Sequence, residues 1–236
     1  MIEEIRRFRR KVEPFEDVEV DVDLQCVLTS GPGMSPAHYD DVWPLADWIE
    51  DDWVNLRVVS PHHLVPAGYH KFFYEKWGPR LSGGAGHQSL CALAAVYLHA
   101  IGKEFLVGGA SACSYAGGWA DAAAKDGSLY VECGTLNTRK PILAMLAGDA
   151  LMVLPYTLGC DKPNEQILER LDPFPEQVEE DIRTASEFRL NLDNSVRIGR
   201  IGRACLGYIF EPKCTLRPDP SKPPLGLRAP RKEKDL

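Results

Sequence analysis

The segment 82–156 constrains the fold most, because its elements can be predicted in order from their residue patterns. Apolar residues recur at helical spacing, then short apolar runs separated by turn residues follow, and a Lys-Asp-Gly sequence joins two of these runs as a hairpin. In chain order we expect a helix at 86–102, a strand at 103–109, two strands that flank a turn at 124–128, a second helix at 137–148 and a fourth strand at 150–156.

This order predicts the fold class. Three strands in a meander, followed by a crossover helix and a fourth strand, give a mixed β-sheet flanked by helices, which is an α/β fold. We expect the core of the domain at 81–160, an N-terminal elaboration packed on it at 1–80, and a helix and strands that complete the domain at 161–216.

The flanking segments are less regular. Residues 17–30 alternate like a strand, and 44–56 have apolar residues at helical spacing. Residues 61–79 favour a packed loop and a short helix, and their three histidines are typical of packing or surface positions because no cysteine or carboxylate lies at ligand spacing. We further expect a charged helix at 175–192 and one or two strands at 195–212.

Composition limits the classes of function. The net charge of -7 disfavours nonspecific binding to nucleic acid, although 217–236 hold six Lys or Arg against three Asp or Glu and are expected to form a disordered basic tail. No apolar run approaches the roughly 20 residues of a membrane span, and the first residues lack the apolar centre of a signal peptide. The seven scattered cysteines form no C-x-x-C pair. We therefore expect a cytoplasmic protein with no membrane partner.

Two acidic residues flank the predicted hairpin. Asp121 begins one arm and Glu132 ends the other, and residues on paired strands lie within reach of one another. Converging carboxylates repel unless a cation lies between them, and Mg²⁺ or Mn²⁺ prefers oxygen ligands, to which the Cys133 carbonyl would add one more. The alternative is two exposed acids at a turn, paired with Lys125 or Arg139.

The order of elements, together with Trp-Ala-Asp on one arm and Val-Glu-Cys on the other, resembles the PD-(D/E)XK nuclease-like superfamily, in particular its competence-protein CoiA-like branch. The resemblance covers about a third of the chain and implies a restriction-endonuclease-like fold. It maps the metal-binding acids onto Asp121 and Glu132. The family lysine, which would orient the attacking water, falls on Gly134, so Arg139 or Lys140 would have to replace it.

A preceding helix that carries a histidine also fits the resemblance, and His87 occupies that place, so His87 or Gln88 would assist the reaction. His87 also lies on an apolar helix face, so a buried structural histidine is the alternative.

These features lead to two principal hypotheses. The first is a Mg²⁺- or Mn²⁺-dependent endonuclease or exonuclease, with DNA favoured as the nucleic acid. The second is a catalytically inactive scaffold of the same fold that acts as an adaptor for nucleic acid or protein. A third, a cysteine hydrolase, would require a reactive thiolate at Cys113.

Overall fold

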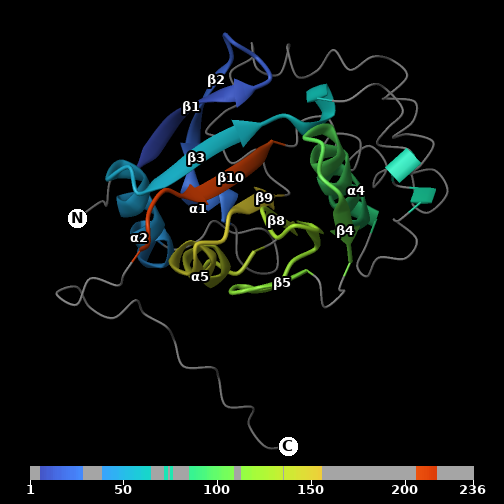
Figure 1. The fold of residues 1–236 in the computed structure, drawn as a ribbon. Helices are drawn as coiled ribbons and strands as arrows, with labels where there is room; N and C mark the ends of the chain where they lie inside the picture. Colours follow the sequence, from blue (N-terminus) through green and yellow to red (C-terminus); the bar gives the residue numbers. More distant parts are fainter. Residues whose placement is uncertain are drawn as a thin grey trace, which may run out of the picture.

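Eight described strands form one mixed sheet in the computed structural model of the protein (Figure 1). A separate small sheet pairs β5 (Ser114–Tyr115) with β6 (Gly118–Trp119). The structure describes residues 6–28, 39–64, 72–73, 75–76, 85–108, 113–134, 136–155 and 206–216. Across the large sheet the order is β2 (Glu19–Asp23), β1 (Arg7–Glu13), β3 (Val54–Val59), β10 (Gly207–Pro212), β9 (Leu151–Leu154), β8 (Tyr130–Cys133), β7 (Ala122–Ala124) and β4 (Phe105–Val107).

Helices cover both faces of this sheet (Figure 1). One face carries α2 and α5, which contact each other, and the other face carries α4, which contacts β4, β7 and β8. The short α1 adjoins α2, and a 3-10 helix, η1, contacts α4. The bounds of these elements are α1 (Leu24–Val27), α2 (Tyr39–Glu50), η1 (Pro61–Leu64), α4 (Ala85–Ala100) and α5 (Arg139–Ala147).

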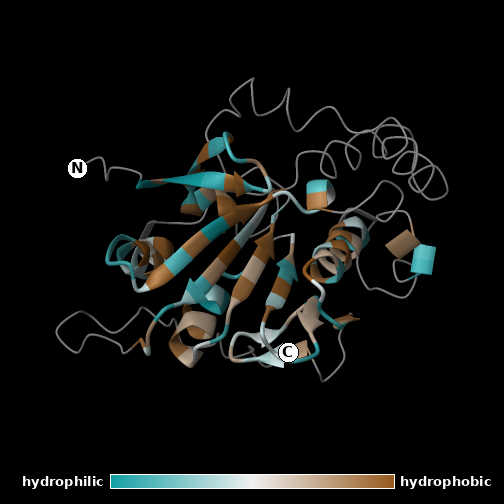
Figure 2. Ribbon diagram, turned by 45° about the horizontal axis from the view of Figure 1, so that its top comes forward, coloured by the Kyte–Doolittle hydropathy of each residue, from teal (hydrophilic) through white to brown (hydrophobic). Residues whose placement is uncertain are grey.

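The central strands are buried on both faces, and their apolar residues are brown in Figure 2. On β9, Leu151 and Val153 belong to the hydrophobic cluster that includes α2 and α5, whereas Met152 and Leu154 belong to the cluster that includes α4. Strands buried on both sides have continuous apolar sequences, and this is why 150–156 was readable as a strand.

The predicted order of the central segment is confirmed. Helix α4 precedes an antiparallel meander of β4, β7 and β8. Helix α5 then crosses over to β9, which pairs parallel with β8. Strand β10 lies antiparallel beside β9, within the predicted strand region at 195–212. The protein is therefore an α/β protein with a large mixed sheet flanked by helices.

The N-terminal strands extend the same sheet. Strand β10 pairs with β3, and β3 pairs parallel with β1, so residues far apart in the chain form adjacent strands. The strand predicted at 17–30 ends early, because the Asp23 side chain accepts hydrogen bonds from the Gln25 and Cys26 amides and caps α1. Both boundaries of the helix predicted at 44–56 lie earlier in the chain, since α2 spans Tyr39–Glu50 and β3 begins at Val54.

Several expectations lie outside the described residues: most of 65–84, the helix at 175–192 and the basic tail at 217–236. Of the three histidines at 61–79, His63 packs edge-on against the Phe15 ring, with centroids 4.9 Å apart. Among the helices that the structure describes, none is both long and apolar enough to cross a bilayer.

Replacement of Gly207 tests the packing of the central strands. A Cβ at Gly207 would lie 2.1 Å from Met152 Cε and 3.0 Å from Val59 Cγ2. We expect Gly207→Val to lower the free energy of unfolding by about 1–3 kcal/mol through overpacking, and Gly207→Ala to lower it less, because the Met152 terminus can rotate. Urea denaturation measures both variants, and equal stability of Gly207→Val and the parent would contradict this packing.

Candidate functional site

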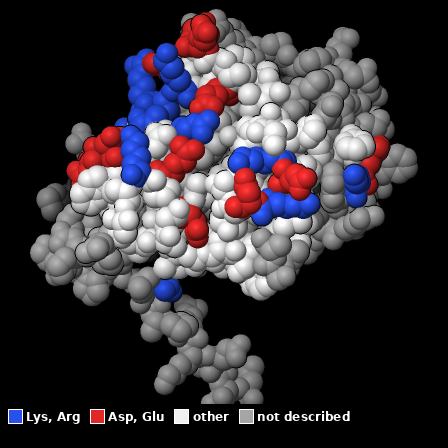
Figure 3. Space-filling view, viewed as in Figure 1, with Lys and Arg blue, Asp and Glu red and all other residues white. Residues whose placement is uncertain are grey.

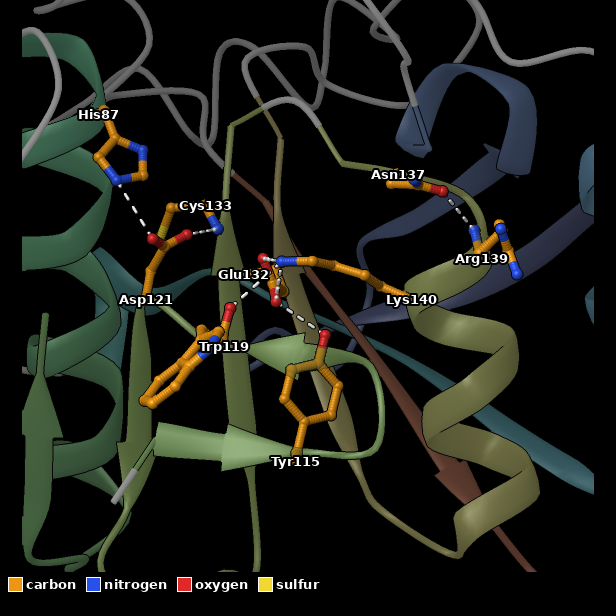
Figure 4. Close-up of polar contacts among 9 residues, drawn as sticks. All are labelled: His87, Tyr115, Trp119, Asp121, Glu132, Cys133, Asn137, Arg139 and Lys140. Carbon is orange, nitrogen blue, oxygen red and sulfur yellow. Dashed lines mark hydrogen bonds and ion pairs between the residues drawn. The ribbon is translucent and has the colours of Figure 1, made fainter. Parts of the chain in front are cut away.

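The two hairpin carboxylates lie at the same end of the sheet, one at the start of β7 and one on β8 (Figure 4). Asp121 precedes β7 directly, and its backbone amide donates to the Val131 carbonyl at 2.9 Å. The carboxylates do not converge as expected from the sequence, because each points to a different partner. Asp121 is directed toward α4, whereas Glu132 is directed toward α5 (Figure 4).

Glu132 is a buried carboxylate held by three hydrogen bonds. Lys140 Nζ donates to both of its oxygens, at 2.7 and 2.8 Å, and the Tyr115 hydroxyl donates to Oε1 at 2.7 Å. The Glu132 side chain is 6% exposed, and that of Lys140 is 27% exposed. A carboxylate so far removed from water is tolerated because it is both paired and hydrogen-bonded.

The start of α5 places Lys140 over the end of β8. The Asn137 side chain accepts the Arg139 amide at 3.0 Å, and Pro141 lies in the first turn, where its missing N–H costs no helix bond. A cation in this turn opposes the helix dipole. The contact with Glu132 compensates for that cost, and a further bond from Lys140 Nζ to the Trp119 carbonyl, at 3.2 Å, fixes its direction.

The backbone conformation at position 134 favours glycine. Its φ is +84°, in the left-handed region, directly after β8. A side chain in that conformation costs about 1–2 kcal/mol. A lysine at this position would therefore be strained, and the ammonium group reaches Glu132 from Lys140 instead.

Tyr115 reaches Glu132 from the small β5–β6 hairpin, which the sequence analysis did not predict. Its ring stacks on Tyr130, with centroids 5.0 Å apart. Gly117 is required for this arrangement, because a Cβ there would lie 2.5 Å from the Tyr115 ring. The single arm expected before the turn at 124–128 is instead divided into β6 and β7, with Ala120 and Asp121 between them.

The Asp121 carboxylate makes its contacts on the α4 side of the sheet. Its Oδ2 accepts the Cys133 amide at 2.8 Å, and its Oδ1 lies 3.2 Å from His87 Nε2. His87 Nε2 also lies 3.5 Å from the Sγ of Cys91, one turn further along α4. Asp121 thereby connects the hairpin to the first turns of α4.

The electrostatics of the two carboxylates differ. Burial raises the pKa of Glu132, an effect that the hydrogen bonds from Lys140 and Tyr115 partly offset and the charge of Asp121 increases. The hydrogen bond to Asp121 raises the pKa of His87 to about 10, so the imidazole is protonated at neutral pH. The two carboxylates thus face two cations, His87 and Lys140, and the four charges balance.

Other predicted residues have different positions. Lys125 pairs with Glu104 at 3.0 Å, on the surface, and with neither site acid. Arg139 is directed away from Glu132 (Figure 4), and Gln88 is buried in α4. Cys113 is buried, and burial raises the pKa of its thiol, which is the opposite of what a nucleophilic thiolate requires.

Three residues near the site were not predicted to have a role there: Tyr115, Trp119 and Cys91. Tyr115 and Trp119 depend on a hairpin of two-residue strands, too short for a periodic pattern. Cys91 had an available signal, since it follows His87 by four residues on a helix, which places both side chains on one face.

Comparisons with protein-family models, with curated proteins and with solved structures found no match. The function must therefore be inferred from the geometry of the site.

The contact between Asp121 and His87 can be tested by titration. In chelator-treated protein we expect the His87 imidazole to titrate near pH 10, above its usual value of about 6.5. Because the pKa is higher in the folded state, this pair stabilises the fold fully below about pH 6.5 and the contribution is lost as the pH rises toward 10.

NMR of the imidazole resonances measures this pKa, and Asp121→Asn, which removes its main cause, should lower it. A parent His87 that titrates near pH 6.5, or one that Asp121→Asn leaves unchanged, would contradict the contact.

Proposed function

We propose that the protein is a metal-dependent nuclease that hydrolyses phosphodiester bonds of nucleic acid, with DNA as the favoured substrate. The observation that carries the proposal is the contact of Lys140 with both oxygens of Glu132, beside Asp121. Two acids from a hairpin and one lysine from the next helix make the set of groups that the PD-(D/E)XK resemblance implies, with Lys140 in place of a lysine at Gly134.

The order of elements supports this proposal. The resemblance rests on a helix, three strands, a helix and a strand, and α4, β4, β7, β8, α5 and β9 follow in that order. Asp121 and Glu132 lie where the second and third of these strands bring their ends together. A restriction-endonuclease-like fold is therefore part of the proposal.

The donor set also fits the proposed ion. The carboxylates of Asp121 and Glu132 are hard oxygen ligands, which suit Mg²⁺ or Mn²⁺. To share one ion, the Asp121 carboxylate would turn from His87 toward Glu132. A divalent ion added to a balanced set of two acids and two cations leaves an excess of positive charge. An anionic phosphodiester neutralises that excess, so we expect the metal to bind more tightly together with nucleic acid.

The chain's own residues have defined roles in this reaction. The oxygen of a water molecule attacks phosphorus as the bond from phosphorus to the leaving oxygen breaks, and negative charge grows on the phosphoryl oxygens. The attacking water releases a proton to solvent, and the leaving oxygen takes one up to become a hydroxyl group. When bound, the metal neutralises part of this charge and lowers the pKa of the water. Lys140 holds Glu132 in place and presents a positive charge beside the reacting phosphate. Tyr115 positions Glu132.

Trp119 offers a contact for a nucleobase. Its side chain is 57% exposed, although its carbonyl accepts a hydrogen bond from Lys140. An exposed aromatic ring beside a phosphate-binding group is the arrangement that stacks bases of single-stranded nucleic acid.

The basic side chains over β1 to β3 are a weaker candidate for binding nucleic acid. Acidic groups are interspersed among them (Figure 3). Arg9 pairs with Glu19, and Arg57 pairs with both Glu13 and Glu211. These arginines are already neutralised by neighbours, so we place the substrate at the Trp119 side.

Substitution of the site residues tests the proposed chemistry. We expect Asp121→Asn, Glu132→Gln and Lys140→Met each to lower Mg²⁺-dependent cleavage of a labelled DNA by about 100-fold or more, the size of effect seen when one transition-state contact is removed. Arg139→Met is the matched control, since it changes the adjacent cation, which points away from Glu132, and should leave the rate within about threefold.

Circular dichroism checks that each variant is folded. Parent protein that binds DNA but does not cleave it with Mg²⁺ or Mn²⁺ would contradict the nuclease and identify an adaptor. Folded Asp121→Asn and Glu132→Gln variants that cleave at the parent rate would contradict the site.

Trp119→Ala tests the base contact. Stacking contributes about 1–3 kcal/mol per base, so we expect the Kd for a single-stranded oligonucleotide to rise about 5- to 150-fold by fluorescence anisotropy. Trp53→Ala removes another exposed indole, 45% exposed, at the start of β3, and should leave the Kd unchanged. Equal effects of the two substitutions would contradict a specific role for Trp119.

A further inference from the structure

One group of potential metal ligands in the described part of the chain combines nitrogen, sulfur and oxygen. His87 and Cys91 lie four residues apart on α4, so their side chains project from one face of the helix. Asp121 approaches the same point from the hairpin. The three ligand atoms, one from each residue, all lie within 4.8 Å of one another.

The spacing of these atoms suits a small tetrahedral ion. Zn²⁺ with bonds of about 2.0–2.3 Å holds its ligand atoms about 3.3–3.7 Å apart. His87 Nε2 lies 3.2 Å from Asp121 Oδ1 and 3.5 Å from Cys91 Sγ. Small side-chain movements are therefore enough to place an ion among the three atoms.

The surroundings of the group favour binding as well. The Cys133 amide holds Asp121 Oδ2, which leaves Oδ1 directed at His87, in the way that outer hydrogen bonds orient metal ligands. The His87 and Asp121 side chains are 22% and 27% exposed, which gives an ion access, whereas Cys91 is buried. The ion would take the place of the proton that His87 Nε2 shares with Asp121, because a ligating imidazole must be neutral.

We propose that His87, Cys91 and Asp121 form a binding site for a thiophilic divalent ion of the Zn²⁺ class. Thiolate and imidazole ligands select Zn²⁺ over Mg²⁺, so this site differs in chemistry from a carboxylate site at Asp121 and Glu132. Three protein ligands leave a fourth position open for water or a substrate atom. The proposal does not depend on the proposed hydrolysis, because it requires only the three ligand atoms.

Both ions would use Asp121, so the two sites share a ligand. Occupancy of the thiolate site removes Asp121 from the carboxylate pair. If the protein is the proposed nuclease, Zn²⁺ therefore inhibits Mg²⁺-dependent cleavage, and Cys91→Ser relieves this inhibition without loss of the activity with Mg²⁺.

Cobalt substitution tests the site directly, with no need for an activity. The full chain is freed of metal by dialysis against a chelator and titrated with Co²⁺, and absorption spectra are recorded. We expect a sulfur-to-cobalt charge-transfer band and the intense visible bands of four-coordinate Co²⁺, both removed by Zn²⁺. Cys91→Ser should abolish the charge-transfer band, and Asp121→Asn should weaken binding by more than about 100-fold, beyond the effect of an outer-shell change.

Cys214→Ser is the control for adventitious binding, because Cys214 is an exposed free thiol. This variant should keep the spectrum of the parent. A charge-transfer band that persists in folded Cys91→Ser, disappears in Cys214→Ser, or is absent from the parent would overturn the proposal. Cleavage assays with Mg²⁺ on the same Cys91→Ser sample separate this result from any failure of the nuclease proposal.

Discussion

The burial of the Glu132 carboxylate is the constraint on which this end of the molecule depends. An unpaired charge at that depth would cost several kcal/mol, and three hydrogen bonds from Lys140 and Tyr115 compensate for it. Those bonds explain otherwise costly features nearby, namely a lysine in the first turn of α5 and a hairpin whose Gly117 leaves room for the Tyr115 ring. Lys140 and Gly117 therefore both help to accommodate the buried Glu132 carboxylate.

Asp121 shows the complementary arrangement toward α4. Its carboxylate takes the place of a backbone acceptor for the Cys133 amide and contacts His87. Each acid therefore has a cationic partner from a different helix, and the site holds balanced charge without an added ion. This balance is the reason why we link the proposed metal binding to the arrival of an anionic substrate. Asp121 is the ligand that the two proposed metal sites share.

The sequence predicted the central segment well because its strands are buried on both faces and its helices have clear apolar spacing. Asp121, Glu132 and Lys140 could also be identified as candidate site residues. Their places at the strand ends and at the start of a helix follow from the predicted order of elements. Tyr115 could not, because it depends on two-residue strands without a periodic pattern. The pairing of β3 with β1 and with the distant β10 could not be predicted either, because register between strands so far apart in the chain depends on tertiary packing.

The central claim is that Asp121 and Glu132 together hold a divalent ion during hydrolysis of a phosphodiester. The most direct measurement is anomalous diffraction from crystals of the protein grown with an oligonucleotide and Mn²⁺. The account predicts an Mn²⁺ peak at about 2.0–2.6 Å from carboxylate oxygens of both residues, with Lys140 still beside Glu132. An unaltered Glu132–Lys140 pair with no peak beside it, or a peak bound by Asp121 without Glu132, would contradict the claim.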